Sequence, residues 1–323
     1  MFAQVWEQAD QMLQWNGFEM LVSFARRRGS IRPGMLLALV SASALVGAPS
    51  GVSAQHRVAD DTGANLELVA PARRIISLAP GATELLFAAG AGSRIIATVQ
   101  GSDEPIAAKD IERIGDANAL NYERLKLLKP DVIVVWQSLA NPMVVQSLKK
   151  LELPLYFVSV GGFEDIPASI RRLGILAGTS AVAETSAKQL MARVASLPKP
   201  PAKPRFDVFY MIWDSPLYTV GSRSLMSEAI RRCGGRNIFD DLDMPAPIVE
   251  FGVILGRNPD VIIMAAPPIT ARDWRERWQA FPDVKAVANK RMVSFTDTRL
   301  TRMGPTAFDA VDDLCELMGN LPD

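Results

Sequence analysis

Aromatic and polar side chains that follow short apolar runs are the residues of this chain best suited to bind a small molecule. Trp136 ends a run that begins at Val132, and Trp213 and Tyr218 follow a second run that ends at Ile212. Ligands of open parallel α/β sheets bind at the carboxyl ends of the strands, so residues at such ends are candidates for the walls of a cleft. The candidate ligand-binding residues are Ala79, Pro80, Gly81, Asp103, Trp136, Trp213, Tyr218, Asp297 and Arg302.

Four of these residues have a structural alternative. A tryptophan at the end of a strand is also common in a core or at its rim, so Trp136 and Trp213 can serve packing instead of binding. Asp297 and Arg302 can form a surface ion pair with each other, and such pairs contribute little to stability.

Few side chains in this sequence support catalysis or metal binding. The chain has one histidine, His56, which precedes the first predicted strand, so the expected fold lacks a histidine-based metal site and a Ser-His-Asp triad. The acidic dipeptide Asp103-Glu104 is an acid/base candidate, but carboxylates in loops are mostly solvated. Nucleophile-elbow, phosphate-loop and metal motifs are absent. Because these motifs are absent, a binding protein is favoured over the alternative, an exported enzyme.

Composition and charge narrow the class of protein further. The chain has 323 residues, of which 49% are apolar and 22% charged, so it is globular and long enough for two domains. Lysine plus arginine equals aspartate plus glutamate, at 35 each. Without a basic surface excess, no nucleic-acid partner is expected.

A phrase that occurs twice predicts the architecture. Lys-Pro-Asp-Val-Ile-Val-Val-Trp spans 129–136, and Asn-Pro-Asp-Val-Ile-Ile-Met-Ala spans 258–265. The proline ends a helix, and the unbroken β-branched run after it is typical of a parallel strand buried on both faces. Strands and helices alternate around both copies. The sequence therefore predicts two similar α/β lobes with parallel sheets, over 72–163 and 205–323.

The segment between the two lobes, 164–204, is expected to be helical. Residues 180–196 are alanine-rich and predict one long helix, about 25 Å in length at 1.5 Å per residue. The prolines of 198–204 end it. A rigid helix, and not a flexible linker, is thus expected to join the lobes.

The N-terminus has the pattern of an export signal. Four arginines between 26 and 32 precede the short apolar run 35–46, and small residues lead to Ala54. This predicts a signal peptide cleaved after Ala54 and a periplasmic protein; a retained membrane anchor is the alternative. Residues 55–71 are expected to form a flexible tail. In an oxidising compartment Cys233 and Cys315 are expected to pair, with two free thiols as the alternative.

The sequence resembles the periplasmic substrate-binding proteins of ABC importers, in the helix-bridged class that carries cobalamin, haem and iron–siderophores. The similar stretches begin Arg-Arg-Ile-Ile-Ser-Leu at 73, Asn-Tyr-Glu-Arg-Leu at 121, Cys-Gly-Gly-Arg-Asn-Ile-Phe at 233, Pro-Asp-Val-Ile-Ile at 259 and Asp-Asp-Leu-Cys at 312. Together the resemblance covers about 72–321. It implies a monomer that holds its ligand between two lobes and delivers it to a membrane permease.

Within that class the chain is most similar to the cobalamin-binding members. Cys233 and Cys315 lie where those proteins have a disulfide, Trp136 matches a tryptophan that contacts cobalamin, and Arg302 matches an arginine of those proteins. The resemblance implies that a corrinoid is the transported ligand and that no further cofactor is bound. Asp297 and Arg302 are then expected to hydrogen-bond amide side chains of the corrin.

The chain departs from those members at several positions. Aromatic residues of the family are replaced by Ala117, Ile212 and Ala246, so the pocket lining differs. The glutamates that dock on the permease fall at Pro142 and Gly252, and Glu84 and Glu250 are nearby carboxylates. The docking residues therefore differ from those of the family or lie elsewhere.

Haem or a ferric siderophore remains the alternative ligand within the same class. Haem would require a histidine or tyrosine ligand, and an anionic siderophore would require several arginines. The lobes contain four tyrosines and, besides Arg302, two arginines suited to that role: Tyr122, Tyr156, Tyr210, Tyr218, Arg223 and Arg299. A receptor-linked binding module would share the pocket and differ only in its partner.

Overall fold

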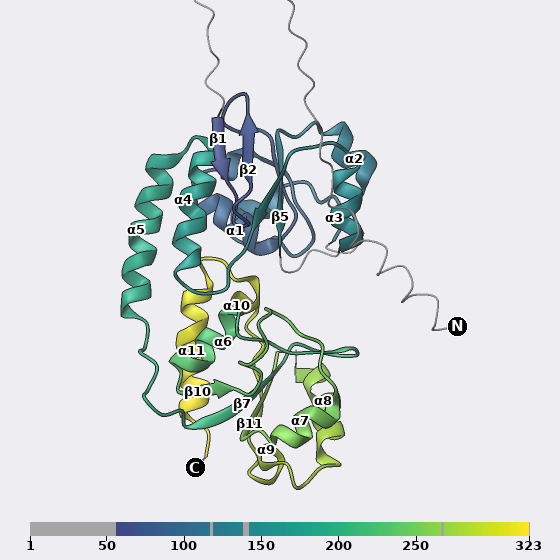
Figure 1. Cartoon of the computed structure of the whole chain (residues 1–323), viewed down its shortest axis with the longest axis vertical. Helices are drawn as coiled ribbons and strands as arrows, with labels where there is room; N and C mark the ends of the chain where they lie inside the picture. The colour runs from purple at the N-terminus through teal and green to yellow at the C-terminus, as the bar shows by residue number, and fades with distance from the viewer. Residues whose placement is uncertain (1–55, 117–118, 138–141, 266–267, 323) are drawn as a thin grey trace, which may run out of the picture. The chain divides into compact units, whose positions relative to one another are not determined.

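Two four-stranded parallel sheets organise the protein, as the computed structural model shows (Figure 1). The structure describes residues 56–116, 119–137, 142–265 and 268–322. The signal peptide and its cleavage site predicted after Ala54 lie outside these ranges. The expected α/β class with parallel sheets in two lobes is confirmed.

The sheet of lobe 1 has the strand order β4-β3-β5-β6, with every neighbouring pair parallel. Its strands are β3 (Ile75–Ser77), β4 (Ile95–Ala97), β5 (Val132–Trp136) and β6 (Leu155–Val158). All five residues of β5 are buried, and alternate side chains enter two different hydrophobic clusters. The strand is therefore covered on both faces, as an unbroken apolar run requires.

The sheet of lobe 2 repeats this order as β10-β7-β11-β12, again parallel throughout. Its strands are β7 (Phe206–Met211), β10 (Gly235–Asn237), β11 (Val261–Met264) and β12 (Met292–Ser294). β5 and β11 occupy the same place in the two sheets. The repeated phrase is thus the equivalent central strand of each lobe.

The helices and short 3₁₀ helices of the described residues are η2 (Gly92–Arg94), η3 (Ile106–Asp110), α1 (Pro80–Ala88), α2 (Tyr122–Leu127), α3 (Pro142–Lys149), α4 (Asp165–Ala177), α5 (Ser180–Ser196), α6 (Leu225–Arg232), α7 (Phe251–Arg257), α8 (Pro268–Gln279), α9 (Lys285–Ala288), α10 (Thr298–Arg302) and α11 (Ala307–Gly319). The Asn121 side chain caps α2 by accepting the Arg124 N–H. The Asp297 side chain caps α10 by accepting the Arg299 N–H. Within the described ranges no helix has the length and apolarity needed to cross a membrane.

The long helix predicted between the lobes is α5, with the bounds 180–196 that the sequence indicates. It packs along α4, where a Cβ added to Gly174 would lie 2.2 Å from the Ala183 Cβ (Figure 1). Near its carboxyl end, Arg193 pairs with Asp309 and Asp312 of α11, at 3.4 and 3.3 Å. α5 therefore contacts elements that follow both sheets.

The segment expected to be a loose tail instead forms an antiparallel hairpin of β1 (His56–Ala59) and β2 (Asn65–Leu68). Its turn docks on lobe 1 through Asp61, whose side chain is 4% exposed. The Asp61 carboxylate pairs with Arg172 at 2.7 Å and accepts the Ser169 hydroxyl and the Ser159 N–H, each at 2.8 Å. These contacts overcome the polar composition of the segment, which alone suggested disorder.

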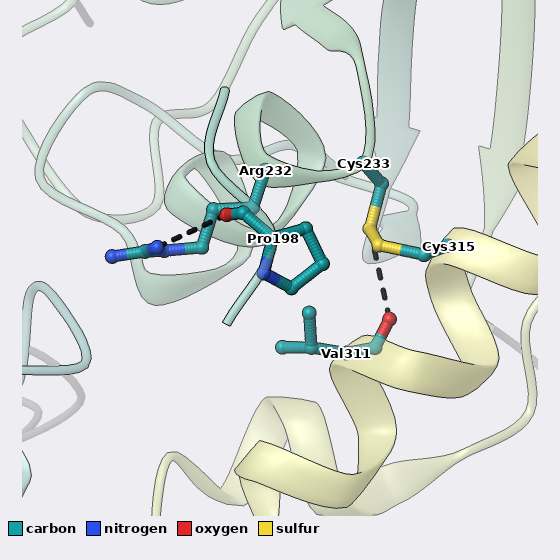
Figure 2. The surroundings of a disulfide bond; sticks show 5 residues. All are labelled: Pro198, Arg232, Cys233, Val311 and Cys315. Carbon is teal, nitrogen blue, oxygen red and sulfur yellow. Dashed lines mark hydrogen bonds between the residues drawn. A yellow bond between two sulfur atoms is a disulfide. The ribbon is translucent and has the colours of Figure 1, made fainter. Parts of the chain in front are cut away.

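A disulfide joins Cys233, at the end of α6, to Cys315 in α11 (Figure 2). The bond closes a loop across 82 residues of lobe 2. The Val311 carbonyl oxygen, one turn before Cys315, lies 3.6 Å from the Cys233 sulfur. The pairing expected from the sequence is present, so α6 and α11 are covalently tied.

Candidate functional site

A cavity of about 550 Å³ opens between the two lobes. It is lined by Gln137, Ser159, Val160, Gly161, Asp165, Arg223 and Pro245. The lobe 1 part of this wall follows the carboxyl ends of β5 and β6, where an α/β fold places its ligands. The volume lies in the range of about 300–1,000 Å³ that is usual for small-molecule sites.

The cavity wall is mostly polar. Asp165 is committed to its own loop, because Oδ2 accepts the Gly161 and Gly162 N–H groups at 2.9 Å each. Arg223 is 67% exposed at the side chain and lies 3.9 Å from Asp243, a long and solvated ion pair. Its guanidinium is therefore available for a carbonyl, carboxylate or phosphate oxygen of a ligand, and Gln137 offers an amide.

The predicted residues Ala79, Pro80 and Gly81 form the start of α1. Pro80 occupies the first turn, where a missing N–H costs nothing. A Cβ added to Gly81 would lie 1.9 Å from the Arg302 carbonyl oxygen and 3.0 Å from the Trp136 ring. Glycine is thus required here, because the backbone of lobe 2 approaches α1 at this point.

Trp136 lies in the hydrophobic core and is 2% exposed. The structure places it under the cleft, while the next residue, Gln137, lines the cavity. In the structure Trp136 has the packing role that the sequence offered as the alternative to ligand binding. A contact between Trp136 and a ligand remains a prediction.

Asp297 and Arg302 have different partners from those expected. The Arg302 Nε lies 3.0 Å from the Glu84 Oε1, an ion pair whose N–H is not aligned for a hydrogen bond. Asp297 accepts the Arg299 N–H at 2.9 Å and pairs with its guanidinium. Burial acts to raise the pKa of Asp297, but the hydrogen bonds from Arg299 outweigh it and the pKa is lowered. A ligand contact by either residue stays a prediction.

Trp213 and Tyr218 face each other on a short hairpin, β8 (Trp213–Asp214) and β9 (Leu217–Tyr218). Ile248 pairs with Tyr218 from the other side. Directly opposed residues of antiparallel strands point to the same face. Trp213 and Ile248 are 56% and 58% exposed, so the three side chains form an uncovered apolar strip. Ile248 lies three residues after the cavity-lining Pro245, and the three residues of the strip do not themselves line the cavity.

Asp103 is exposed and accepts a hydrogen bond from Arg113 at 3.0 Å. It lies in the loop after β4, where a Cβ added to Gly101 would touch the Pro80 ring at 3.6 Å. The loop therefore borders the start of α1. Asp103 lies near the first lobe's share of the cleft without lining the cavity.

The positions that depart from the family pattern are distributed around the site. Ala246 follows the cavity-lining Pro245, and Ile212 precedes Trp213. Ala117 lies outside the described residues.

The two positions where the family has docking glutamates are accessible on the surface. Of the two nearby carboxylates, Glu250 is exposed and Glu84 is buried. Pro142 is exposed at the start of α3, and an added Cβ at Gly252 would meet nothing within 4 Å. Glu250 is exposed at the N-cap of α7. Glu84 is 4% exposed, so it cannot present its carboxylate to another protein.

The cavity residues themselves were missed from the sequence, apart from Arg223. The apolar run 155–160 predicts a strand whose carboxyl end leads into Gly161-Gly162, so a usable signal existed. Applying the strand-end rule there indicates Ser159, Val160 and Gly161. In the ranges that the structure describes, no group of three histidine, cysteine or acidic side chains is arranged to hold a metal ion.

Comparison with known proteins agrees with this geometry. The periplasmic binding protein family model matches residues 75–297. A vitamin B12-binding protein of Vibrio cholerae is 31% identical over 246 residues, covering 76% of this chain and 88% of its own length.

Two solved structures have the same fold. The periplasmic vitamin B12-binding protein of Vibrio cholerae aligns with a TM-score of 0.67 and 30% identity, over 77% of this chain and 97% of its own. A periplasmic haem-binding protein of Roseiflexus sp. RS-1 aligns with a TM-score of 0.63 over 76% of this chain and 97% of its own, but at 21% identity it shows the shared fold alone. With its two lobes, its interlobe cavity and a match over more than half its length, the chain belongs to the periplasmic binding protein family.

Proposed function

We propose that this protein captures cobalamin or a related corrinoid in the interlobe cavity and delivers it to the permease of an ABC importer. The observation that carries the proposal is the cavity between two equivalent lobes in a chain 31% identical to a vitamin B12-binding protein. The permease, a monomeric state and export to the periplasm through cleavage after Ala54 are parts of the same proposal. Binding without catalysis is a further part of it.

The chemistry of the cleft suits a large flat ligand with amide substituents. Arg223 donates to carbonyl oxygens, and Gln137 both donates and accepts. Trp213 and Tyr218 add an exposed and a partly exposed ring on the β8–β9 hairpin, and aromatic faces give large contact at small entropic cost. Asp297 is paired with Arg299, and Arg302 with Glu84. To bind the ligand, each would exchange this partner for a ligand group.

The tyrosines give haem a weaker site. Tyr156 and Tyr210 are fully buried, so neither can reach an iron in the cavity. Tyr122 and Tyr218 are partly exposed, and neither lines the cavity. A ferric siderophore would find Arg223 in the wall. Both ligands belong in the binding experiment as competing outcomes.

Tryptophan fluorescence of the purified periplasmic protein tests the ligand class. Cyanocobalamin, haem and a ferric siderophore are titrated separately, and a non-binding protein corrects for inner-filter absorption. Saturable one-to-one quenching by cyanocobalamin alone is expected. Saturation by haem or the siderophore, without a response to cyanocobalamin, would reject the corrinoid and keep the carrier class.

A variant pair places the binding site on the molecule. Trp213→Ala is expected to weaken cyanocobalamin binding, because it removes the exposed ring that the proposal assigns to the ligand site. Val69→Ala is the control, since Val69 is 85% exposed in the loop before β3, at the amino end of that parallel strand. Equal affinity in both variants would remove the hairpin from the ligand site.

A further inference from the structure

The first helix of each lobe carries a glutamate at the same position. Glu84 lies in α1 six residues before Gly90, and Glu228 lies in α6 six residues before Gly234. Both glycines follow the end of their helix with positive φ, +77° and +85°. Because the two sheets have the same strand order, the two glutamates are structurally equivalent.

Each glutamate reaches out of its own lobe to the start of a helix in the other. The Glu84 Oε2 accepts the Thr306 hydroxyl at 2.7 Å and its N–H at 3.4 Å, and Thr306 is the N-cap of α11. The Glu228 Oε2 accepts the Phe163 N–H at 2.9 Å, two residues before α4 begins. A carboxylate at a helix N-terminus is favoured both by the free N–H groups and by the helix dipole.

Each contact is tightened by a glycine of the opposite lobe. A Cβ added to Gly304 would lie 2.5 Å from the Glu84 Oε2, and one added to Gly162 would lie 2.7 Å from the Glu228 Oε2. The glycines let the backbone approach the carboxylates closely. The two contacts are thus built in the same way with the lobes exchanged.

The two contacts flank a shared apolar centre. The Phe163 and Phe308 rings pack at 5.1 Å between centroids, and both residues are at most 1% exposed. Phe163 donates its N–H to Glu228. Phe308 is the second residue after Thr306, the N-cap whose hydroxyl donates to Glu84. The seam between the lobes therefore has a quasi-twofold arrangement around this ring pair.

We propose that Glu84 and Glu228 are positioning residues, which hold the two lobes at the separation that forms the ligand cavity. Removing one carboxylate leaves the other contact in place, so the lobes are expected to keep their separation. Removing both leaves the apolar contacts, such as the phenylalanine pair and the approach of the Arg302 backbone to Gly81, without a polar contact at either helix start. The separation is therefore expected to vary more than either single change predicts. The loss of both contacts is also expected to speed ligand release, a consequence that rests on the proposed function.

The distance between the lobes tests this without a ligand. Spin labels are attached through non-natural amino acids at Lys126 and Asp283, both exposed and in different lobes, so that the native disulfide stays intact. The wild type is expected to give one narrow distance distribution. Glu84→Ala and Glu228→Ala should each broaden it slightly, and the double variant should broaden it by more than the sum. The control Glu123→Ala/Glu276→Ala removes two exposed carboxylates that lie outside the interlobe contacts.

Two further variants separate positioning from a general loss of structure. Gly304→Ala should displace the lobes, because its methyl group meets the Glu84 carboxylate. Gly162→Ala should do the same at the other contact, because its methyl group would lie 2.7 Å from the Glu228 Oε2. A folded double alanine variant with the distribution of the control would overturn the proposal, and so would wild-type distances in both glycine variants.

Ligand kinetics provide a second readout. The double alanine variant should release cyanocobalamin roughly tenfold faster, with little change in association, since affinity differences act mostly through dissociation. The variants Glu84→Gln and Glu228→Gln, which keep an acceptor oxygen, should stay near the wild-type rate. Broadened distances with unchanged release would overturn the positioning role in binding. Absence of any cyanocobalamin binding in the wild type would reject the proposed ligand and leave the distance result unaffected.

Discussion

Removal of the Cys233–Cys315 bond should destabilise lobe 2 and leave lobe 1 folded. The bond closes a loop with a sequence separation of 82 and ties the end of α6 to α11 (Figure 2). In the chain-entropy model a loop of that length removes about 15 cal/mol/K from the unfolded ensemble, or about 4.5 kcal/mol at 25 °C. Because compact unfolded states reduce this figure, we expect a loss of about 3–4 kcal/mol.

Urea unfolding measures the effect. With a slope of about 2 kcal/mol per molar urea, the transition of lobe 2 should fall by roughly 1.5–2 M. Trp274 and Trp278 lie in a core cluster of lobe 2 and report on it, while Trp136 belongs to lobe 1 and is silenced by Trp136→Phe. Separate transitions for the two lobes are then visible by comparing fluorescence with circular dichroism.

Reduction of the wild type separates the crosslink from packing. Dithiothreitol should shift the wild-type transition and leave the Cys233→Ala/Cys315→Ala variant unchanged, since that variant has no bond to break. The reasoning is refuted if reduction lowers the wild-type midpoint by less than about 0.5 M, because the loop-entropy term would then be largely absent.

Three further changes test the packing at and around the seam. Gly81→Ala should cost about 1–3 kcal/mol in unfolding free energy, because the methyl group meets the Arg302 carbonyl oxygen; unaltered stability in a urea titration would contradict that contact. Asp61→Ala should cost roughly 2 kcal/mol and expose the 56–68 hairpin to proteolysis, because the buried carboxylate holds its turn; protease resistance equal to wild type would show that the hairpin is held otherwise. Burial raises the pKa of Glu84; the negative charge of Glu104 acts in the same direction, and the positive charge of Arg302 acts to lower the pKa. The contribution of Glu84 to stability is therefore fully present below its unfolded-state pKa and is lost as pH rises through its folded-state pKa. The wild type should thus gain stability relative to Glu84→Gln as pH falls from 7 to 4, and a constant difference across that range would exclude the raised pKa.

The parts of the fold predicted from sequence are those that local chemistry determines. An unbroken β-branched run has only a doubly covered parallel strand as a satisfactory environment, so β5 and β11 could be identified. The alanine-rich run of α5 lies between a turn and a proline cluster, and its bounds followed directly.

The parts that were missed depend on partners distant in sequence. The 56–68 hairpin is ordered by Arg172 and Ser169, more than a hundred residues away from Asp61. Trp136 is buried because α1 and lobe 2 meet above it, which its position at a strand end does not reveal. The pairing of Arg302 with Glu84, and not with Asp297, likewise depends on how the lobes meet. Residues at the seam were therefore identified as important from sequence, but their roles were not.

The most direct test of the central claim is calorimetric titration of the purified protein with cyanocobalamin, beside a variant that fills the cavity. Ser159→Phe places a ring in the interlobe cavity at a residue whose backbone, and not its side chain, anchors the hairpin turn. We predict one-to-one binding by the wild type and loss of that binding in a variant whose circular dichroism is unchanged. Absence of saturable binding in the wild type, or equal affinity in Ser159→Phe, would contradict the claim that a corrinoid occupies this cavity.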